Sequence, residues 1–237
     1  MTFTYNDVYV KDTATIAGPY EKKGPLKKYF DKTFDDLYYD EDSWEKAEIK
    51  SVKESLKLLH KKVGIKRKEV DVILGGDLLN QIAATTYGAY NFSKCFLGLY
   101  GACSTSVEAM ILGSVLIDAK RVKNAIVTVS SHNMAAEKQF RNPTEYGAPK
   151  PKSATFTATG SASMLLTKEK TDIKVESSTI GQIIDLNQND PNDMGKVMAP
   201  AAIDTIKRHL KDLNRKPDYY DLIVTGDLGL YGKEILD

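Results

Sequence analysis

Apolar and polar residues follow two periods along this chain, one typical of amphipathic helices and one typical of buried strands. The first helical pattern consists of apolar residues at roughly helical spacing with lysines between them: Ala47, Val52, Leu56, Leu59 and Val63. This pattern predicts a helix that begins near Asp42, with Glu45 in its first turn, and that ends near Gly64.

Strand-like and helix-like segments then alternate. Short apolar runs predict strands at 70–74, 96–99 and 125–129, and apolar stretches between them predict helices at 78–90 and 107–119. The order strand–helix–strand–helix–strand is typical of a parallel sheet with helices on its faces. The sequence therefore predicts an α/β fold.

The pattern breaks at residues 131–157, which contain prolines, little periodicity and a polar cluster, and which predict a long loop. Structureless loops of this length are uncommon in compact domains and tend to be functional. Beyond the loop, strands are predicted at 161–166, 173–176 and 221–225. A helix with Pro200 in its first turn is predicted before the last of these strands.

An internal repeat with a constant offset of 150 residues relates two parts of the chain. The matching residues are Leu56, Val63, Asp71, Ile73, Gly76, Asp77 and Leu78 in the first copy and Ile206, Leu213, Asp221, Ile223, Gly226, Asp227 and Leu228 in the second. Two helix–strand units also resemble each other by chance, but a period of this length indicates duplication of a domain half. The prediction is a first half over residues 1–195 and the start of a duplicated second half over residues 196–237.

Composition narrows the functional classes. Of the 237 residues, 42% are hydrophobic and 27% are charged, which is near the globular average and excludes disordered and fibrous classes. The 33 Lys and Arg residues nearly balance the 32 Asp and Glu residues and leave a formal charge of +1. This charge lacks the positive excess that is typical of nucleic-acid-binding proteins. With no signal-peptide layout, no long apolar run and only two cysteines, an intracellular protein without a transmembrane helix is expected.

The first candidate site is the turn Gly101–Ser106, which lies between a predicted strand and a predicted helix that Ser104 would cap. This position brings the Cys103 thiol to a helix N-terminus, where unpaired N–H groups and the helix dipole favour a thiolate and could receive an oxyanion. The alternative is that Cys103 is a small buried residue, which is the commoner role of a free cysteine among alanine and serine.

A second candidate site directly follows the strand predicted at 125–129 and consists of Ser130, Ser131, His132 and Asn133. Ligands bind outside the carboxyl ends of strands in open parallel sheets, and the Cys103 turn lies at the same end of its own strand. A shared pocket is therefore expected, in which His132 orients or deprotonates a neighbouring group. The alternative is a loop histidine that local hydrogen bonds satisfy.

The long loop adds polar and aromatic candidates for ligand binding: Phe140, Arg141, Thr144, Glu145 and Tyr146. A guanidinium binds a carboxylate through two parallel hydrogen bonds, and aromatic side chains stack on a flat ring. The alternative is a solvated loop in which Arg141 merely pairs with Glu145.

The thiol-bearing turn, the αβ pattern and the duplication together resemble the thiolase and ketoacyl synthase superfamily. Within it, motifs that occur in order along nearly the whole chain resemble the stage V sporulation protein AD family. These motifs are Gly18-Pro19, Gly24-Pro25-Leu26, Gly76-Asp77-Leu78-Leu79-Asn80-Gln81, Gly101-Ala102-Cys103-Ser104-Thr105-Ser106, Ser130-Ser131-His132-Asn133, Gln139-Phe140-Arg141, Pro143-Thr144-Glu145-Tyr146-Gly147, Asp193-Met194-Gly195 and Met198-Ala199-Pro200-Ala201-Ala202.

The resemblance implies a thiolase-like fold, a mostly parallel sheet with helices on both faces. It implies a part in sporulation and germination, through binding of dipicolinic acid, free or as its calcium chelate, for uptake into the developing spore. It also implies a location on the cytoplasmic face of the spore inner membrane, beside membrane subunits of the same system, and self-association into a homodimer. No cofactor and no metal site in the protein are expected.

Condensing enzymes of this superfamily move protons with residues from their second half, and the repeat predicts only the start of such a half in residues 196–237. A strand that often begins Asp-Gly-Ala in those enzymes reads Thr159-Gly160-Ser161. A binding protein is therefore favoured over an enzyme. The alternatives are an acyl-transferring condensing enzyme with Cys103 as its nucleophile and a scaffold subunit whose pocket is vestigial.

Overall fold

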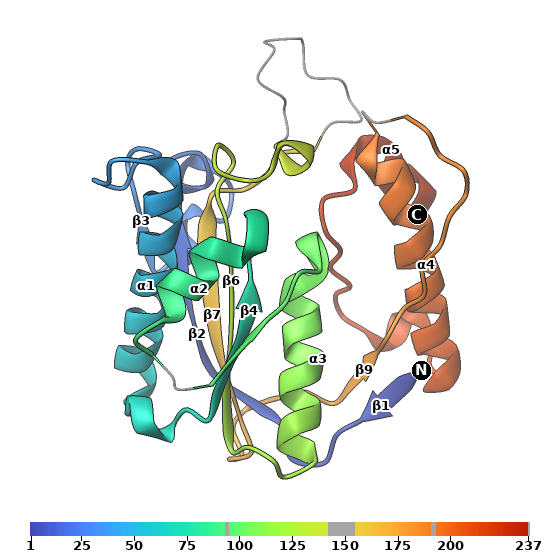
Figure 1. The fold of residues 1–237 in the computed structure, drawn as a ribbon. Helices are drawn as coiled ribbons and strands as arrows, with labels where there is room; N and C mark the ends of the chain where they lie inside the picture. The colour runs from blue at the N-terminus through green and yellow to red at the C-terminus, as the bar shows by residue number, and fades with distance from the viewer. Residues whose placement is uncertain (93–94, 142–154, 191–192, 237) are drawn as a thin grey trace. The chain divides into compact units, whose positions relative to one another are not determined.

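The computed structural model describes residues 1–92, 95–141, 155–190 and 193–236 (Figure 1). Its contacts divide the chain into two compact units. The larger, called here the sheet unit, contains residues 5–141 and 157–176, and the smaller, called the C-terminal unit, contains the described residues of 1–4, 142–156 and 177–237.

The sheet unit is built on a seven-stranded sheet with the order β3-β2-β7-β6-β4-β5, in which β8 also pairs with β2. The strands are β2 (Tyr9–Ala17), β3 (Lys32–Thr33), β4 (Val72–Gly76), β5 (Phe96–Gly98), β6 (Asn124–Ser131), β7 (Gly160–Thr167) and β8 (Ile173–Lys174). β4 runs parallel to β5 and β6, whereas β7 runs antiparallel to β6 and β2. The sheet is therefore mixed, and β4 and β6 lie side by side in its centre with their carboxyl ends at one edge.

Helices cover both faces of this sheet (Figure 1). α1 (Trp44–Val63) packs on β2, β6 and β7 and on α2 (Ala83–Ala89), and α3 (Thr105–Asp118) packs on β4, β6 and β7 from the other side. The core under α1 is apolar and fully buried, with members Val52, Leu56, Leu59, Ile73, Ile126 and Leu165. The predicted α/β fold with helices on both faces is confirmed.

The buried face of α1 also carries hydroxyl groups that bond to the strands beneath it. Ser51 Oγ donates to Ser161 Oγ at 2.7 Å, and Ser55 Oγ lies 2.8 Å from Ser163 Oγ. Ser163 Oγ also lies 2.8 Å from Thr128 Oγ1 on β6. Each buried hydroxyl in this row has a partner, so the row avoids the cost of unsatisfied polar atoms and fixes how α1 lies on the sheet.

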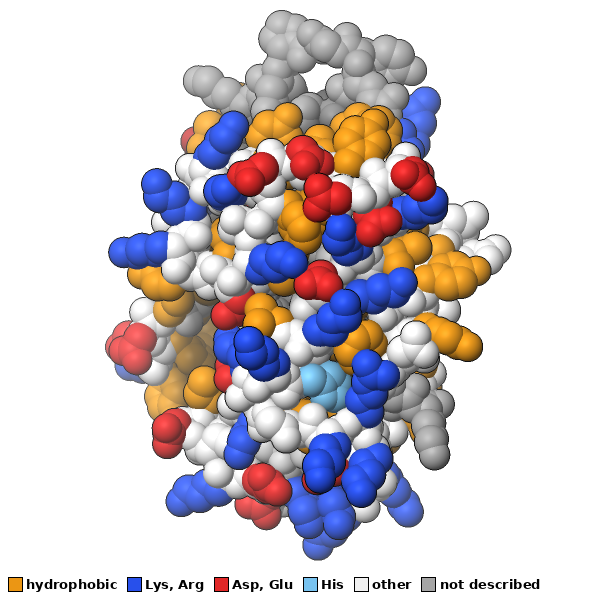
Figure 2. Space-filling view, turned by 90° about the vertical axis from the view of Figure 1, so that its left-hand side faces the viewer, with side chains coloured by type: hydrophobic (Ala, Val, Ile, Leu, Met, Phe, Trp, Pro, Cys, Tyr) orange, Lys and Arg blue, Asp and Glu red, His pale blue; other side chains and the backbone are white. Residues whose placement is uncertain are grey.

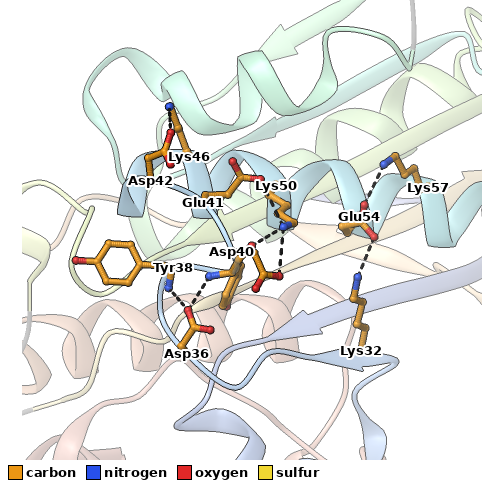
Figure 3. Close-up of polar contacts among 11 residues, drawn as sticks. Lys32, Asp36, Tyr38, Asp40, Glu41, Asp42, Lys46, Lys50, Glu54 and Lys57 are labelled. Carbon is orange, nitrogen blue, oxygen red and sulfur yellow. Dashed lines mark hydrogen bonds and ion pairs between the residues drawn. The ribbon is translucent and has the colours of Figure 1, made fainter.

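The ends of α1 follow from local chemistry. The Ser43 hydroxyl accepts a hydrogen bond from Lys46 N at 3.3 Å, and Gly64 ends the helix with a φ of 67°, a conformation that glycine adopts without strain. The predicted end at Gly64 is confirmed. The first cap is Ser43 and not Asp42, whose carboxylate instead pairs with the Lys46 ammonium at 2.8 Å (Figure 3).

The solvent face of α1 carries mixed charges. Lys50 pairs with Asp40 and Glu41, and Glu54 pairs with Lys32 and Lys57 (Figure 3). Figure 2 shows the side of the molecule that includes α1, where lysine and arginine side chains are interspersed with acidic ones. This mixture agrees with the formal charge of +1.

The helix predicted over 78–90 is shorter than expected. Residues Asn80–Ile82 form a 3-10 turn, in which Gln81 and Ile82 have φ angles of 58° and 49°, and α2 begins only at Ala83. Two successive residues in the left-handed region break a helix, although neither is a glycine. The strands predicted from apolar runs appear as β4, β5, β6 and β7, with ends that differ by a few residues.

The C-terminal unit contains a two-stranded antiparallel ribbon and two helices. β1 (Thr2–Thr4) pairs with β9 (Ser177–Thr179), and α4 (Met194–Asp212) packs on β9 and on α5 (Gly229–Leu236). A hydrogen-bonded series connects these elements. Thr179 Oγ1 lies 2.8 Å from His209 Nδ1, and His209 Nε2 lies 2.6 Å from the Tyr220 hydroxyl.

Two predictions in this unit are wrong. Pro200 lies inside α4, because the helix begins six positions earlier, where the Asp193 side chain accepts a hydrogen bond from Lys196 N at 3.0 Å. Residues 221–225 form no strand, because no described strand pairs with them. Leu222 and Val224 accordingly remain 76% and 77% exposed.

The 150-residue offset recurs in the structure. α1 begins at Trp44 and α4 at Met194, and 3-10 turns follow at Arg67–Glu69 and Pro217–Tyr219. A further local match is a carboxylate that accepts a hydrogen bond from the N–H two residues later: Asp77 with Leu79 N at 2.8 Å, and Asp227 with Gly229 N at 2.9 Å. The helix start, the 3-10 turn and the carboxylate contact thus follow the same sequence pattern twice, whereas β4 has no strand as its counterpart at 221–225. The division after residue 195 stays a prediction.

Candidate functional site

The Cys103 turn has a fixed backbone and an exposed thiol. Gly101 N donates to Thr105 Oγ1 at 3.0 Å, and Thr105 Oγ1 donates to Ala102 O at 2.9 Å. Ala102 has a φ of 48°, in the left-handed region, and Cys103 follows it in an exposed position. The turn therefore presents the Cys103 side chain to solvent at the start of α3, so Cys103 is not a buried packing residue.

Ser104 does not cap α3 with its side chain. Its hydroxyl donates backwards to Gly101 O at 2.7 Å, and its N–H donates to the same carbonyl at 2.9 Å. Both Ser104 donors thus serve the turn itself. The expected side-chain cap is therefore wrong, because the tighter 3-10 turn takes up this hydroxyl.

The end of β4 packs directly against this turn. A Cβ atom on Gly76 would lie 1.9 Å from Leu99 O and 3.2 Å from Thr105 Cγ2. Any side chain at position 76 would therefore push the Cys103 turn away from the sheet. The absence of a Cβ sets the distance between the ends of β4 and β5.

Asp77 follows Gly76 and organises the next segment. Its carboxylate, in a residue only 2% exposed, accepts hydrogen bonds from Leu79 N at 2.8 Å and from Thr85 N at 2.6 Å. Burial raises the pKa of Asp77, while the two backbone N–H groups act in the opposite direction. Asp77 thereby fixes the 3-10 turn and the start of α2.

The segment after β6 returns to the same edge of the sheet. Glu137 N donates to Leu78 O at 2.9 Å, and Arg141 Nε donates to Ala136 O at 2.6 Å. The ring of Phe140 lies edge-on to the ring of Tyr100, with 6.4 Å between the centroids. Residues 137–141 are thus anchored beside the end of β4 and reach the residue that precedes the Cys103 turn.

Tyr100 stands at the meeting point of these segments. Partial desolvation, together with the negative charges of Glu137 and Asp77, raises the pKa of the Tyr100 phenol. Tyr100 remains 51% exposed, so it forms part of the surface at this edge of the sheet. Sequence reasoning missed this residue, although its place directly before Gly101 and two residues after the end of β5 was a usable signal.

The side chains of Ser130–Asn133 are engaged inside the protein. Ser130 Oγ donates to Glu48 Oε1 at 2.8 Å, Ser131 Oγ donates to Ala158 O at 2.6 Å, and Asn133 Nδ2 donates to Thr157 O at 3.2 Å. These contacts hold the ends of β6 and β7 and the start of α1 together. They serve the scaffold beneath the site.

His132 is fully buried and uses both ring nitrogens. Nε2 lies 2.8 Å from Leu37 O, and Nδ1 accepts a hydrogen bond from Met134 N at 3.2 Å. This pattern corresponds to a neutral ring with its proton on Nε2. Burial lowers the pKa of His132. The geometry is that of a locally satisfied loop histidine, the alternative considered from the sequence.

The structure therefore gathers a subset of the sequence-predicted site. Cys103, Ser104, Phe140 and Arg141 belong to the two segments that meet at Tyr100, at the carboxyl ends of β4 and β5. Thr144, Glu145 and Tyr146 lie outside the described residues. Asp77, Tyr100, Glu137 and Glu48 are additional polar residues of this region that the sequence reasoning did not select.

Two classes of site are not found in the described part of the chain. No group of three or more His, Cys, Asp or Glu side chains there is arranged to hold a metal ion. None of the helices in residues 1–92, 95–141, 155–190 and 193–236 combines the length and apolarity needed to cross a membrane.

Comparison with known proteins gives a family and a fold. The family model of stage V sporulation protein AD matches residues 1–237. Stage V sporulation protein AD of Bacillus subtilis (strain 168) is 46% identical over 229 residues, which cover 97% of this chain and 68% of that protein.

Among solved structures, 3-oxoacyl-(acyl carrier protein) synthase III of Xanthomonas oryzae pv. oryzae is similar, with a TM-score of 0.63, 12% identity and coverage of 99% of this chain and 81% of that one. Cerulenin-bound OleA of Xanthomonas campestris gives a TM-score of 0.65 at 11% identity, with coverage of 99% and 80%. These likenesses show the fold, which is that of thiolase-like condensing enzymes.

The buried state of His132 predicts a pH dependence of stability. Its folded-state pKa is lowered below the unfolded value of about 6.5, so the unfolded chain binds more protons at acidic pH. The contribution of His132 to the free energy of unfolding should therefore fall as the pH is lowered from about 7 to 5. Urea unfolding at both pH values should show that, on going from pH 7 to pH 5, the wild type loses stability relative to His132→Gln. An equal change in the two proteins would contradict the assignment.

Proposed function

The chain belongs to the stage V sporulation protein AD family, and from this premise we propose that it binds dipicolinic acid, free or as its calcium chelate, for uptake into the developing spore. The family gives the chain its role in sporulation. Our proposal goes further in two respects: the ligand is dipicolinic acid, and the protein binds this ligand without catalysing a reaction on it.

The observation that carries this proposal is the corner formed by Tyr100 and Phe140. Dipicolinate is a flat aromatic ring with two carboxylates, so its site needs an aromatic face and donors that reach the edge of the ring. The rings of Tyr100 and Phe140 lie edge-on at 6.4 Å, directly before the Cys103 turn. A ligand ring that stacks on one of them meets the other at its edge, an arrangement that aromatic groups favour.

Arg141 provides the charge for one ligand carboxylate. The Arg141 Nε–H bond to Ala136 O sets the plane of the guanidinium next to Phe140. A guanidinium held in this way forms charge-assisted hydrogen bonds to a carboxylate at little further entropic cost. The start of α3, a helix of 14 residues, offers a positive dipole end for the second carboxylate.

The proposal includes a location and partners. We expect the protein to act at the cytoplasmic face of the spore inner membrane, beside membrane subunits of the same system, and to self-associate into a homodimer. The support for this part is the family resemblance.

The first test is Arg141→Ala. Loss of a charge-assisted pair should weaken dipicolinate binding by about 2 kcal/mol, or about 30-fold in Kd. Isothermal titration calorimetry with dipicolinate, with and without calcium, measures the change. Lys138→Ala is the matched control, because it removes an exposed positive charge from the same segment without touching the guanidinium. Equal affinities of Arg141→Ala and the wild type would remove Arg141 from the site.

The second test separates the two functions of Tyr100. Tyr100→Phe keeps the ring and removes the hydroxyl next to Glu137, whereas Tyr100→Ala also removes the ring face. Stacking on the ring predicts near-normal affinity for the first variant and a loss of about 1 kcal/mol or more, roughly fivefold in Kd, for the second. Fluorescence titration or calorimetry gives both values. Normal affinity of Tyr100→Ala would show that no ligand ring stacks there.

A second candidate function is acyl transfer through Cys103. It is favoured by the exposed thiol at the start of α3 in a condensing-enzyme fold. Such chemistry also needs a base for the proton of the thiol. His132, the histidine that the sequence placed nearest, has both nitrogens engaged by backbone groups, so the binding function is preferred.

Intact-mass spectrometry after incubation with acyl-coenzyme A compounds distinguishes the two functions. The binding proposal predicts an unchanged mass for the wild type and for Cys103→Ser. A stable adduct with the mass of the acyl group that is present in the wild type and missing in Cys103→Ser would establish acyl transfer instead.

A further inference from the structure

Glu48 is a buried acidic side chain of the sheet unit that forms no ion pair among the described residues. Glu48 lies on α1 and is 1% exposed. Its Oε1 accepts the hydrogen bond from Ser130 Oγ, and its Oε2 has no hydrogen-bond partner among the described residues. An ionised carboxylate in such a place is strongly disfavoured, because neither water nor a positive charge stabilises it.

The charged groups that act on the Glu48 carboxyl are acidic. Glu45 lies one turn earlier on the same helix, and Asp77 approaches from the end of β4. Ser130 comes from β6, and the Tyr39 phenol, fully buried and without a partner for its hydroxyl among the described residues, lies in the segment before α1. Burial and the Asp77 charge raise the pKa of Glu48 to about 8.

The two lysines nearest to Glu48 along α1, Lys46 and Lys50, form their ion pairs with other carboxylates. Lys50, two positions further along α1, donates to Tyr39 O and pairs with Asp40 and Glu41 (Figure 3). Lys46 pairs with Asp42 at 2.8 Å. Neither ammonium compensates the Glu48 carboxylate, which therefore holds its proton at neutral pH.

Glu48 is connected to both segments that form the Tyr100–Phe140 corner. Its helix, α1, packs on α2, and the Asp77 carboxylate holds the start of α2 through the hydrogen bond from Thr85 N. The negative charge of Asp77 also raises the pKa of both Glu48 and Tyr100. The residue after Asp77 holds the second segment, through the bond from Glu137 N to Leu78 O. A change of charge at Glu48 therefore changes the electrostatic environment of the Tyr100–Phe140 corner through the Asp77 carboxylate.

We propose that Glu48 is a proton-binding residue that couples pH to the affinity of the ligand corner, so that an anionic ligand binds best when Glu48 is protonated. This inference rests on the proposed function, because it takes a dicarboxylate as the ligand. Ionisation of Glu48 adds a second negative charge beside Asp77 and repels such a ligand. By linkage, binding of the dianion draws a proton onto Glu48.

Protonation of Glu48 stabilises the folded protein. The folded-state pKa of Glu48 lies above its ordinary value, so its contribution to the free energy of unfolding is complete at acidic pH and is lost as the pH rises through about 8. Glu48→Gln preserves the shape of the protonated acid and removes the titration. Glu54→Gln is the matched control, since Glu54 lies on the same helix in ion pairs with Lys32 and Lys57.

The experiment has a part without ligand and a part with dipicolinate. Urea unfolding between pH 6 and pH 9 should show a loss of stability with rising pH in the wild type and in Glu54→Gln, and a reduced loss in Glu48→Gln.

Calorimetry of dipicolinate binding near pH 8, in buffers of different ionisation enthalpy, should show proton uptake by the wild type and none by Glu48→Gln. Between pH 7 and pH 9 the Kd of the wild type should rise on the order of threefold to tenfold, and that of Glu48→Gln should stay nearly constant.

A second variant keeps the test decisive if Glu48→Gln does not fold. Ser130→Ala removes the hydrogen bond that favours the ionised Glu48, so it should move the pH of half-maximal weakening upward. Equal pH dependence of Kd in the wild type and Glu48→Gln, or binding without proton uptake, would overturn the coupling while leaving the ligand proposal intact. If the wild type binds no dipicolinate at any pH, the proposed function fails and the coupling fails with it.

Discussion

The close contact between the end of β4 and the turn after β5 is the constraint on which the candidate site depends. Gly76 leaves no room for a Cβ against Leu99 O, and this contact sets where the Cys103 turn begins. Asp77 then uses both carboxylate oxygens to hold backbone N–H groups, and Leu78 O anchors the segment that carries Phe140. Three consecutive residues at one strand end thus position the Cys103 turn and residues 137–141, the two segments of the candidate site.

The helix–sheet interface beneath this corner combines apolar packing with buried polar side chains. Serines on α1 bond to serines on β7, and Glu48 accepts from Ser130 on β6. Buried hydroxyl pairs that bond to each other cost little folding free energy and favour one position of α1 on the sheet. The Glu48 carboxyl, in contrast, retains one oxygen without a hydrogen-bond partner among the described residues. The interface therefore combines a specific alignment with one residue whose charge state is poised near physiological pH.

Sequence reasoning succeeded where one residue type has one local meaning. Gly64 ends α1 in the left-handed region, and the run at 70–74 correctly predicted the central strand, which the structure has at Val72–Gly76. It failed where the outcome depends on distant partners. A hydroxyl such as that of Ser130 looks the same in the sequence whether it faces a ligand or Glu48, and an apolar run such as 221–225 forms a strand only beside another strand. The left-handed turn at Gln81 and Ile82 contains no glycine, so the sequence did not indicate it.

The arrangement of the Cys103 turn and His132 separates the architecture of condensing enzymes from their chemistry. The fold delivers an exposed thiol at a helix start. The histidine at the neighbouring strand end, however, bonds to Leu37 O and Met134 N, and its burial opposes a charged ring. The Nδ1 lone pair, which would accept a proton, is already used by Met134 N, so the buried ring is a poor base, whereas its two backbone bonds hold the surrounding segments in place. Binding of a flat anion requires only that the surrounding segments stay where these bonds hold them, so the same local geometry that weakens the case for catalysis supports a site for recognition.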